Sequence, residues 1–263
     1  MIKVEHTNKT FSGKYGEVHA LQDVSIHVEK GDIYGIIGFS GAGKSTLFNA
    51  ICGDFLTDSG VIMLDGQDIT FMPQHVRAKT IGRLYQDPMR GTAPGMTIEE
   101  NLALAAGKGG WLSHVSRQEK ERFHEELKLL DIGLEKRMTQ PVGLLSGGQR
   151  QALTLLMATM NPPKLLLLDE HTAALDPGTA EKVLNLTKRV VEEHQLTCLM
   201  ITHNMQSALD LGNRILMMDS GDIVLDIHEE EKKGLTVEGL LEKFKTGAGK
   251  MLDNDRILLS GEK

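Results

Sequence analysis

The stretch GFSGAGKST, Gly38 to Thr46, decides the fold of this chain. It fits the pattern G-x-x-x-x-G-K-[ST], in which a glycine-rich loop wraps around phosphate groups. The preceding run Ile33–Ile37 is apolar and rich in β-branched residues, which predicts a buried strand. The following segment, Thr46–Cys52, predicts the first turns of a helix. A strand, a loop and a helix in this order predict an α/β protein that binds phosphate where the strand ends.

Each residue type in this loop has a physical reason to be there. Glycines let the backbone curl so that successive N–H groups point at phosphate oxygens, and the helix N-terminus adds partial positive charge. Lys44 is expected to reach the β- and γ-phosphates, and the Ser45 hydroxyl to bind Mg²⁺. A glycine-rich turn that matches by chance is the alternative, which the flanking strand and helix disfavour. The residues expected to contact the nucleotide here are Gly38, Ser40, Gly41, Ala42, Gly43, Lys44, Ser45 and Thr46.

A second signal is the run Leu165–Leu168 followed by Asp169 and Glu170. A continuous apolar run is typical of a parallel strand buried on both faces, and α/β proteins place their ligand chemistry where such strands end. Asp169 can hold Mg²⁺, usually through a water, and Glu170 can polarise an attacking water. By itself the segment also fits a core strand followed by a solvated acidic turn.

The third signal is LSGGQ at Leu145 to Gln149. With these three motifs in this order, the chain resembles the nucleotide-binding subunit of an ATP-binding cassette (ABC) transporter, from about Ile2 to Ile227. The resemblance implies a P-loop NTPase core with an antiparallel β subdomain and a helical signature subdomain. It also implies ATP hydrolysis with ATP and Mg²⁺ as cofactors, in which Lys44, Gln86, Glu170 and His203 are catalytic.

LSGGQ implies that the chain works as a pair. In the family, Ser146, Gly147, Gly148 and Gln149 close over the γ-phosphate held by the opposite subunit. A chain with one copy of each motif then needs a homodimer or another ABC subunit as its partner. Ser146 and Gln149 also fit a capping box at a helix start, and both interpretations can hold together.

Two further positions match the family around the adenine ring and the metal. Tyr15 stands where an aromatic residue stacks on adenine, although the nearby Phe11 could serve instead and Tyr15 could be a surface residue of a turn. Gln86 ends the segment Ile81–Gln86, which resembles the family's glutamine loop, where the glutamine touches Mg²⁺ or the water. The alternative for Gln86 is a glutamine that merely ends a strand. The resemblance therefore assigns the metal to Ser45, Gln86 and Asp169.

Three further polar residues lie C-terminal to the motifs at Leu145–Gln149 and Leu165–Glu170. His203 comes after the apolar strand Thr197–Thr202, where the family places a histidine that bonds the γ-phosphate and orients the water. Asp176 belongs to the segment that crosses the family's dimer interface. His171 stands where the family often has alanine, and it is assigned no chemistry. A structural histidine is the alternative for His203.

The composition of the chain limits its possible partners and its possible location in the cell. Its 263 residues are 40% hydrophobic, enough for a large core, and a net charge of -7 argues against nucleic acid as a partner. We find no apolar run long enough to span a membrane. The only two cysteines, Cys52 and Cys198, lie in apolar segments and are expected to be reduced core residues. The expected location is therefore the cytoplasmic face of the cell membrane, held there through an integral membrane permease.

The sequence also predicts domain boundaries and a cellular role. Residues 1–228 are expected to form the ATPase domain, with a helical subdomain at about 88–142, and residues 229–263 a short helical tail. Ser116 and Glu119 fit a capping box inside that subdomain. The resemblance implies a bacterial importer of a small polar or amino-acid-like solute, working with a solute-binding protein. The ATPase of an exporter or lipoprotein-release complex, or a non-transport ABC protein, is the alternative.

Overall fold

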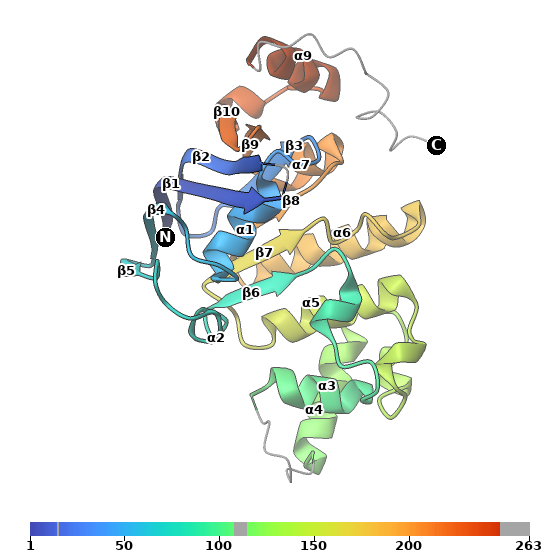
Figure 1. The fold of residues 1–263 in the computed structure, drawn as a ribbon. Coiled ribbons are helices and arrows are strands. Elements are labelled where there is room, and N and C mark those ends of the chain that lie inside the picture. The colour runs from blue at the N-terminus through green and yellow to red at the C-terminus, as the bar shows by residue number, and fades with distance from the viewer. Residues whose placement is uncertain (15, 108–114, 248–263) are drawn as a thin grey trace.

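The centre of the structure is a six-stranded sheet built from the apolar runs of the sequence. The computed structural model describes residues 1–14, 16–107 and 115–247 (Figure 1). The strands lie in the order β10-β9-β3-β8-β7-β6, and all except β10 run parallel to their neighbours. Their bounds are β3 (Ile33–Gly38), β6 (Ile81–Leu84), β7 (Leu165–Asp169), β8 (Thr197–Ile201), β9 (Arg214–Asp219) and β10 (Asp222–Ile227). Every residue of β7 and β8 is buried, which explains their lack of polar alternation.

A second, antiparallel sheet packs across helix α1 (Lys44–Cys52) from the first. Its strand order is β2-β1-β4-β5. The strands are β1 (Ile2–Gly13), β2 (Gly16–Val28), β4 (Ser59–Leu64) and β5 (Gln67–Asp68). Leu47, Phe48 and Ile51 of α1 are fully buried in the core shared by both sheets. The helix begins at Lys44 rather than at Thr46 as expected, so its first turn is part of the phosphate loop.

Helices α5 (Gly147–Thr159) and α6 (Pro177–Glu193) cover the other face of the six-stranded sheet. Helices α3 (Ile98–Ala105) and α4 (Arg117–Lys128) pack against α5 and lie below it in Figure 1. The short helical turns of this part are η1 (Pro88–Gly91), η2 (Leu134–Lys136) and η3 (Val142–Leu144). The predicted capping box is confirmed at α4, because Ser116 Oγ accepts from Glu119 N at 3.3 Å and Glu119 Oε2 accepts from Ser116 N at 2.9 Å. The single turn α2 (Gln74–Arg77) lies near the antiparallel sheet.

The last described elements cover β9 and β10. They are α7 (Met205–Leu211), α8 (Glu229–Lys232) and α9 (Val237–Gly247). Leu240 and Phe244 of α9 are buried in a third apolar core with α7 and these strands. The Phe244 ring lies 5.1 Å from the Phe39 ring of the phosphate loop, measured between centroids. Within the described parts of the chain, no helix combines the length and the hydropathy needed to cross a membrane.

Candidate active site

The phosphate loop folds tightly because two of its glycines occupy positions that no side chain could share. Gly38 ends β3 with a φ of +146°, and a Cβ there would lie 2.2 Å from the Met218 carbonyl oxygen on β9. Gly43 precedes α1 with a φ of +99°, and a Cβ there would lie 2.5 Å from the Ala20 carbonyl oxygen. The loop is therefore pressed against both sheets at these two positions.

Lys44 is the cation of this loop and is almost fully buried, with 4% of its surface exposed. Its Nζ donates to the carbonyl oxygens of Gly38, at 2.8 Å, and Phe39, at 2.9 Å. Burial lowers the pKa of Lys44, while the negative charges of Glu170 and Asp169 oppose that shift. The ammonium group thus lies inside the loop, close to where phosphate oxygens enter.

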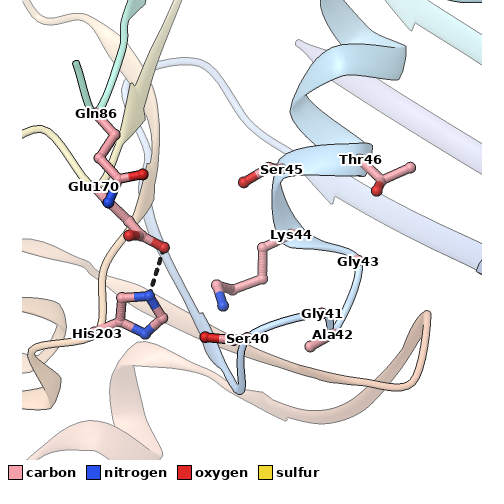
Figure 2. Close-up of a pocket in the computed structure, with 10 residues that line it drawn as sticks. All are labelled: Ser40, Gly41, Ala42, Gly43, Lys44, Ser45, Thr46, Gln86, Glu170 and His203. Carbon is pink, nitrogen blue, oxygen red and sulfur yellow. Dashed lines mark ion pairs between the residues drawn. The ribbon is translucent and has the colours of Figure 1, made fainter. Parts of the chain in front are cut away.

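A carboxylate and an imidazole face this lysine across one pocket of about 370 Å³ (Figure 2). Glu170 follows β7, His203 follows β8, and His203 Nε2 lies 2.6 Å from Glu170 Oε1. The hydrogen bond from His203 is the largest cause of the lowered pKa of Glu170. The carboxylate is therefore ionised at neutral pH and accepts hydrogen bonds. Residues that line the pocket are Ser40, Gly41, Ala42, Gly43, Lys44, Ser45, Thr46, Gln86, Glu170 and His203.

Asp169 lies beside this pocket, at the end of β7. Its Oδ1 accepts from Ser45 Oγ at 3.4 Å, so a hydroxyl and a carboxylate of the kind that Mg²⁺ prefers lie next to each other. Its Oδ2 accepts from an N–H of the Arg83 guanidinium at 2.8 Å. Arg83 was not predicted as a site residue, although an arginine in the otherwise apolar strand β6 was a signal that a buried acid lies nearby.

The signature residues lie away from this pocket in the same chain. Ser146 is the N-cap of α5, where its Oγ accepts from Gln149 N at 3.3 Å and Gln149 Oε1 accepts from Ser146 N at 3.2 Å. The predicted capping box is therefore confirmed. Cβ atoms added at Gly147 and Gly148 would meet the side chains of Leu175 and Thr179, which lie around the start of α6. Asp176 caps α6 by accepting from Thr179 N at 3.0 Å.

Comparison with known proteins agrees with this geometry. The model of the family described as "ABC transporter" matches residues 21–173. The chain is 43% identical to the "Tyrosine transport ATP-binding protein" of Clostridioides difficile over 247 residues, which cover 93% of this chain and 98% of that protein. The chain belongs to the ABC transporter family. It is an ATP-binding, ATP-hydrolysing subunit of that family, and the expected fold is confirmed.

Further relatives of the ABC chain include an importer subunit and solved cassettes. The "Methionine import ATP-binding protein MetN 2" of Enterococcus faecalis is 37% identical, with 94% of this chain and 77% of that protein covered. A dimeric ATP-binding cassette in a post-hydrolysis state, bound to ADP and Pi, is 28% identical with a TM-score of 0.76, covering 87% of this chain and 99% of that chain. An ATP-binding cassette of an ABC transporter, solved in its ADP conformation, is 30% identical with a TM-score of 0.75, covering 93% of this chain and 98% of that chain.

The adenine end of the ABC site is only partly described. Tyr15, the residue expected to stack on adenine, lies outside the described residues. Phe11, the alternative, packs edge-on against Phe55 with ring centroids 5.2 Å apart, and Lys9 Nζ lies 5.5 Å from the Phe11 centroid. Because Phe55 lies just beyond the C-terminal end of α1, the Phe11 ring contacts the end of that helix opposite the phosphate loop.

His171 lies next to Glu170 but points into the core of the cassette. Its Nε2 lies 3.1 Å from Thr187 Oγ1 on α6, and the Thr187 hydroxyl donates to the Val183 carbonyl oxygen at 2.8 Å. The hydroxyl proton is thus already used, so Nε2 carries the proton and donates it to Thr187. Complete burial lowers the pKa of His171 to about 4, which keeps the ring neutral. Cys52 and Cys198 are also buried, and neither forms a disulfide within the described residues.

Proposed function

We propose that this chain powers the import of an amino acid or a similar small polar solute through a membrane permease. The observation that carries the ATPase half of the proposal is the pocket in which Lys44, Glu170 and His203 face one another. The relatives supply the transport half, because two of them are named for tyrosine transport and methionine import. A solute-binding protein that delivers the solute, and a position at the cytoplasmic face of the membrane, belong to the same proposal.

In this proposal the chain's own groups divide the work of hydrolysis. The loop N–H groups and Lys44 hold the phosphates and neutralise their charge. Glu170 accepts a hydrogen bond from the attacking water and takes its proton, while His203 holds the Glu170 carboxylate in place. Ser45, Asp169 and Gln86 would hold Mg²⁺, which supplies charge neutralisation for the phosphate oxygens when it is bound.

The other half of each site comes from a second ABC subunit. Within one chain, Ser146, Gly147, Gly148 and Gln149 are not among the residues that line the pocket. They begin α5, whose N-terminus offers backbone N–H groups and positive potential to a phosphate. Two chains that pair so that each signature meets the other's loop would form two complete sites. Asp176, beside the signature at the start of α6, would then lie at the interface between the chains.

Uptake in cells tests this proposal. In a strain that lacks the chain, uptake of labelled tyrosine, methionine and other amino acids is measured after complementation with the wild type or with Lys44→Ala. Wild type is expected to restore uptake of at least one amino acid, and Lys44→Ala to restore none, because the phosphates lose their main fixed cation. Lys164→Ala, which removes a surface lysine paired with Asp65, is the matched control and should behave like wild type. If loss of the chain leaves uptake unchanged and instead makes a solute accumulate inside the cells, the proposal that the chain powers import is contradicted.

A further inference from the structure

Two guanidinium groups contact the same aromatic ring beside the active site. The Cζ atoms of Arg83 and Arg90 each lie 4.6 Å from the centroid of the Tyr85 ring. Arg83 belongs to β6, Tyr85 follows that strand directly, and Arg90 belongs to the turn η1. Cations placed this close to an aromatic face are attracted by its quadrupole, and the attraction grows when the groups are partly buried. The ring therefore joins the strand to the turn.

Arg83 is also bound firmly at its other end. Its guanidinium donates to Asp169 Oδ2 at 2.8 Å and to Asp54 Oδ2 at 3.2 Å. The Arg83 side chain is only 7% exposed, and its Nε is buried without a hydrogen-bond partner in the described structure. A buried cation held by two carboxylates has little freedom to reorient unless one of those carboxylates changes its charge or position.

Asp169 is the member of this set that contacts the pocket, through the pocket-lining Ser45. While its Oδ2 binds Arg83, its Oδ1 accepts from Ser45 Oγ at 3.4 Å beside the pocket. At the opposite end, Arg90 is exposed and its neighbour Met89 is 41% exposed. Contacts thus continue from the edge of the phosphate site to a surface turn through Asp169, Arg83, Tyr85 and Arg90.

We propose that these four residues act as one connected unit, through which a cation bound at Asp169 shifts the turn η1. The proposal rests on the proposed function for the role of Asp169. A divalent cation at this carboxylate repels the Arg83 guanidinium, and screening is weak because both side chains are mostly buried. The cation therefore binds better when Arg83 has moved away from Asp169, and such a difference in affinity is what allows a ligand to shift a conformational equilibrium. Arg83 is a positioning residue in this unit.

Hydrogen exchange with ADP tests the connection without hydrolysis. The full chain is saturated with ADP, and the exchange of the backbone amides of residues 89–92, in and just after η1, is measured once in EDTA and once in Mg²⁺. We expect Mg²⁺ to change the exchange rate there by about twofold or more in the wild type. Tyr85→Phe keeps the ring and should respond as wild type does. Tyr85→Leu removes the ring and should lose the response, while its ADP affinity in EDTA stays as in the wild type.

Mg²⁺ affinity gives a second, independent readout. Arg83→Met removes the competing charge, so we expect it to bind Mg²⁺ about threefold more tightly or better in the presence of ADP, and to lose the response of residues 89–92. Arg90→Met leaves the Arg83–Asp169 pair intact and should keep wild-type Mg²⁺ affinity. A wild type that binds Mg²⁺ and ADP with no change at residues 89–92 would overturn the inference. So would a full response in Tyr85→Leu, or unchanged or weaker Mg²⁺ binding in Arg83→Met. A wild type that binds no ADP would instead count against the proposed function.

Discussion

His203 Nε2 lies 2.6 Å from Glu170 Oε1, although the two residues follow different strands, β8 and β7. The parallel pairing of these strands brings their carboxyl ends to one edge of the sheet, where Asp169 pairs with Ile201. Glu170 has a φ of +47°, an uncommon conformation for a residue with a side chain. Such backbone strain is found where the surrounding structure holds a functional residue in place. Both the backbone and the imidazole therefore hold this carboxylate toward the pocket.

Replacing Glu170 with glutamine separates ATP binding from hydrolysis. The amide keeps the shape of the side chain but is a poor base, so we expect hydrolysis to fall by about 10²- to 10⁴-fold while ATP affinity is retained. ATP should then trap a dimer, which size-exclusion chromatography with ATP and Mg²⁺ would detect. Glu181→Gln removes the same charge from an exposed position of α6 and serves as the control. If Glu170→Gln releases phosphate at the wild-type rate, Glu170 is not the catalytic base.

His171 makes the stability of the chain depend on pH. Its pKa is about 4 in the folded chain, against an ordinary value of 6.5 for histidine, so the unfolded chain binds the proton more tightly and stability falls as pH drops through this window. Between about pH 7 and pH 5 the loss from this residue is roughly 2 kcal/mol. His171→Gln can still donate to Thr187 but does not titrate, so its free energy of unfolding in urea should fall less over this range. His124→Gln, whose side chain is half-exposed on α4, should follow the wild type. Equal pH dependence in all three proteins would contradict the prediction.

Local signals in the sequence were sufficient for several elements. The apolar run Leu165–Leu168 is fully buried in β7, as its composition predicts. The capping box of Ser146 and Gln149 depends only on residues within one helical turn, and it is present. The apolar run before His203 predicts a strand, which the structure shows as β8 (Thr197–Ile201). Each of these features is determined by neighbours in the chain.

Features that depend on the order of strands in the sheet could not be predicted. Arg83 and Asp169 bind each other because β6 lies next to β7, and the sequence does not show that adjacency. The contact between Phe39 and Phe244 likewise depends on how α9 packs beside β9 and β10. The predicted helical tail covers residues 229–263, and the part of it beyond residue 247 lies outside the described residues.

Two glycines of the phosphate loop should respond differently to alanine. Gly38 and Gly41 both have positive φ, at +146° and +81°, but a Cβ at Gly38 would lie 2.2 Å from the Met218 carbonyl oxygen, whereas a Cβ at Gly41 would meet nothing within 4 Å. Gly41→Ala carries only the backbone strain and should cost about 1 to 2 kcal/mol in the free energy of unfolding. Gly38→Ala adds a clash with backbone and should cost roughly 3 kcal/mol or more. Urea unfolding measures both, and equal losses would show that the loop is looser than its contacts indicate.

The shared site can be tested with two defective chains. Lys44→Ala damages the phosphate loop, and Ser146→Arg damages the signature, so a homodimer of either variant has two damaged sites. A mixed dimer has one intact site, which combines Lys44 of the second variant with Ser146 of the first, and one site damaged on both sides. Because the two residues lie on different elements of the chain, α1 and the N-cap of α5, neither substitution removes the other's contacts.

The most direct measurement is the ATP-dependent pairing of the two variants. Each variant carries a different fluorophore, and pairing is detected as energy transfer between the two fluorophores. Neither variant alone should pair with ATP as the wild type does, and the mixture should pair because one intact site can bind ATP between the chains. If either variant alone pairs with ATP as well as the wild type, or if the mixture never pairs better than each variant by itself, the ATP site is not shared between two chains.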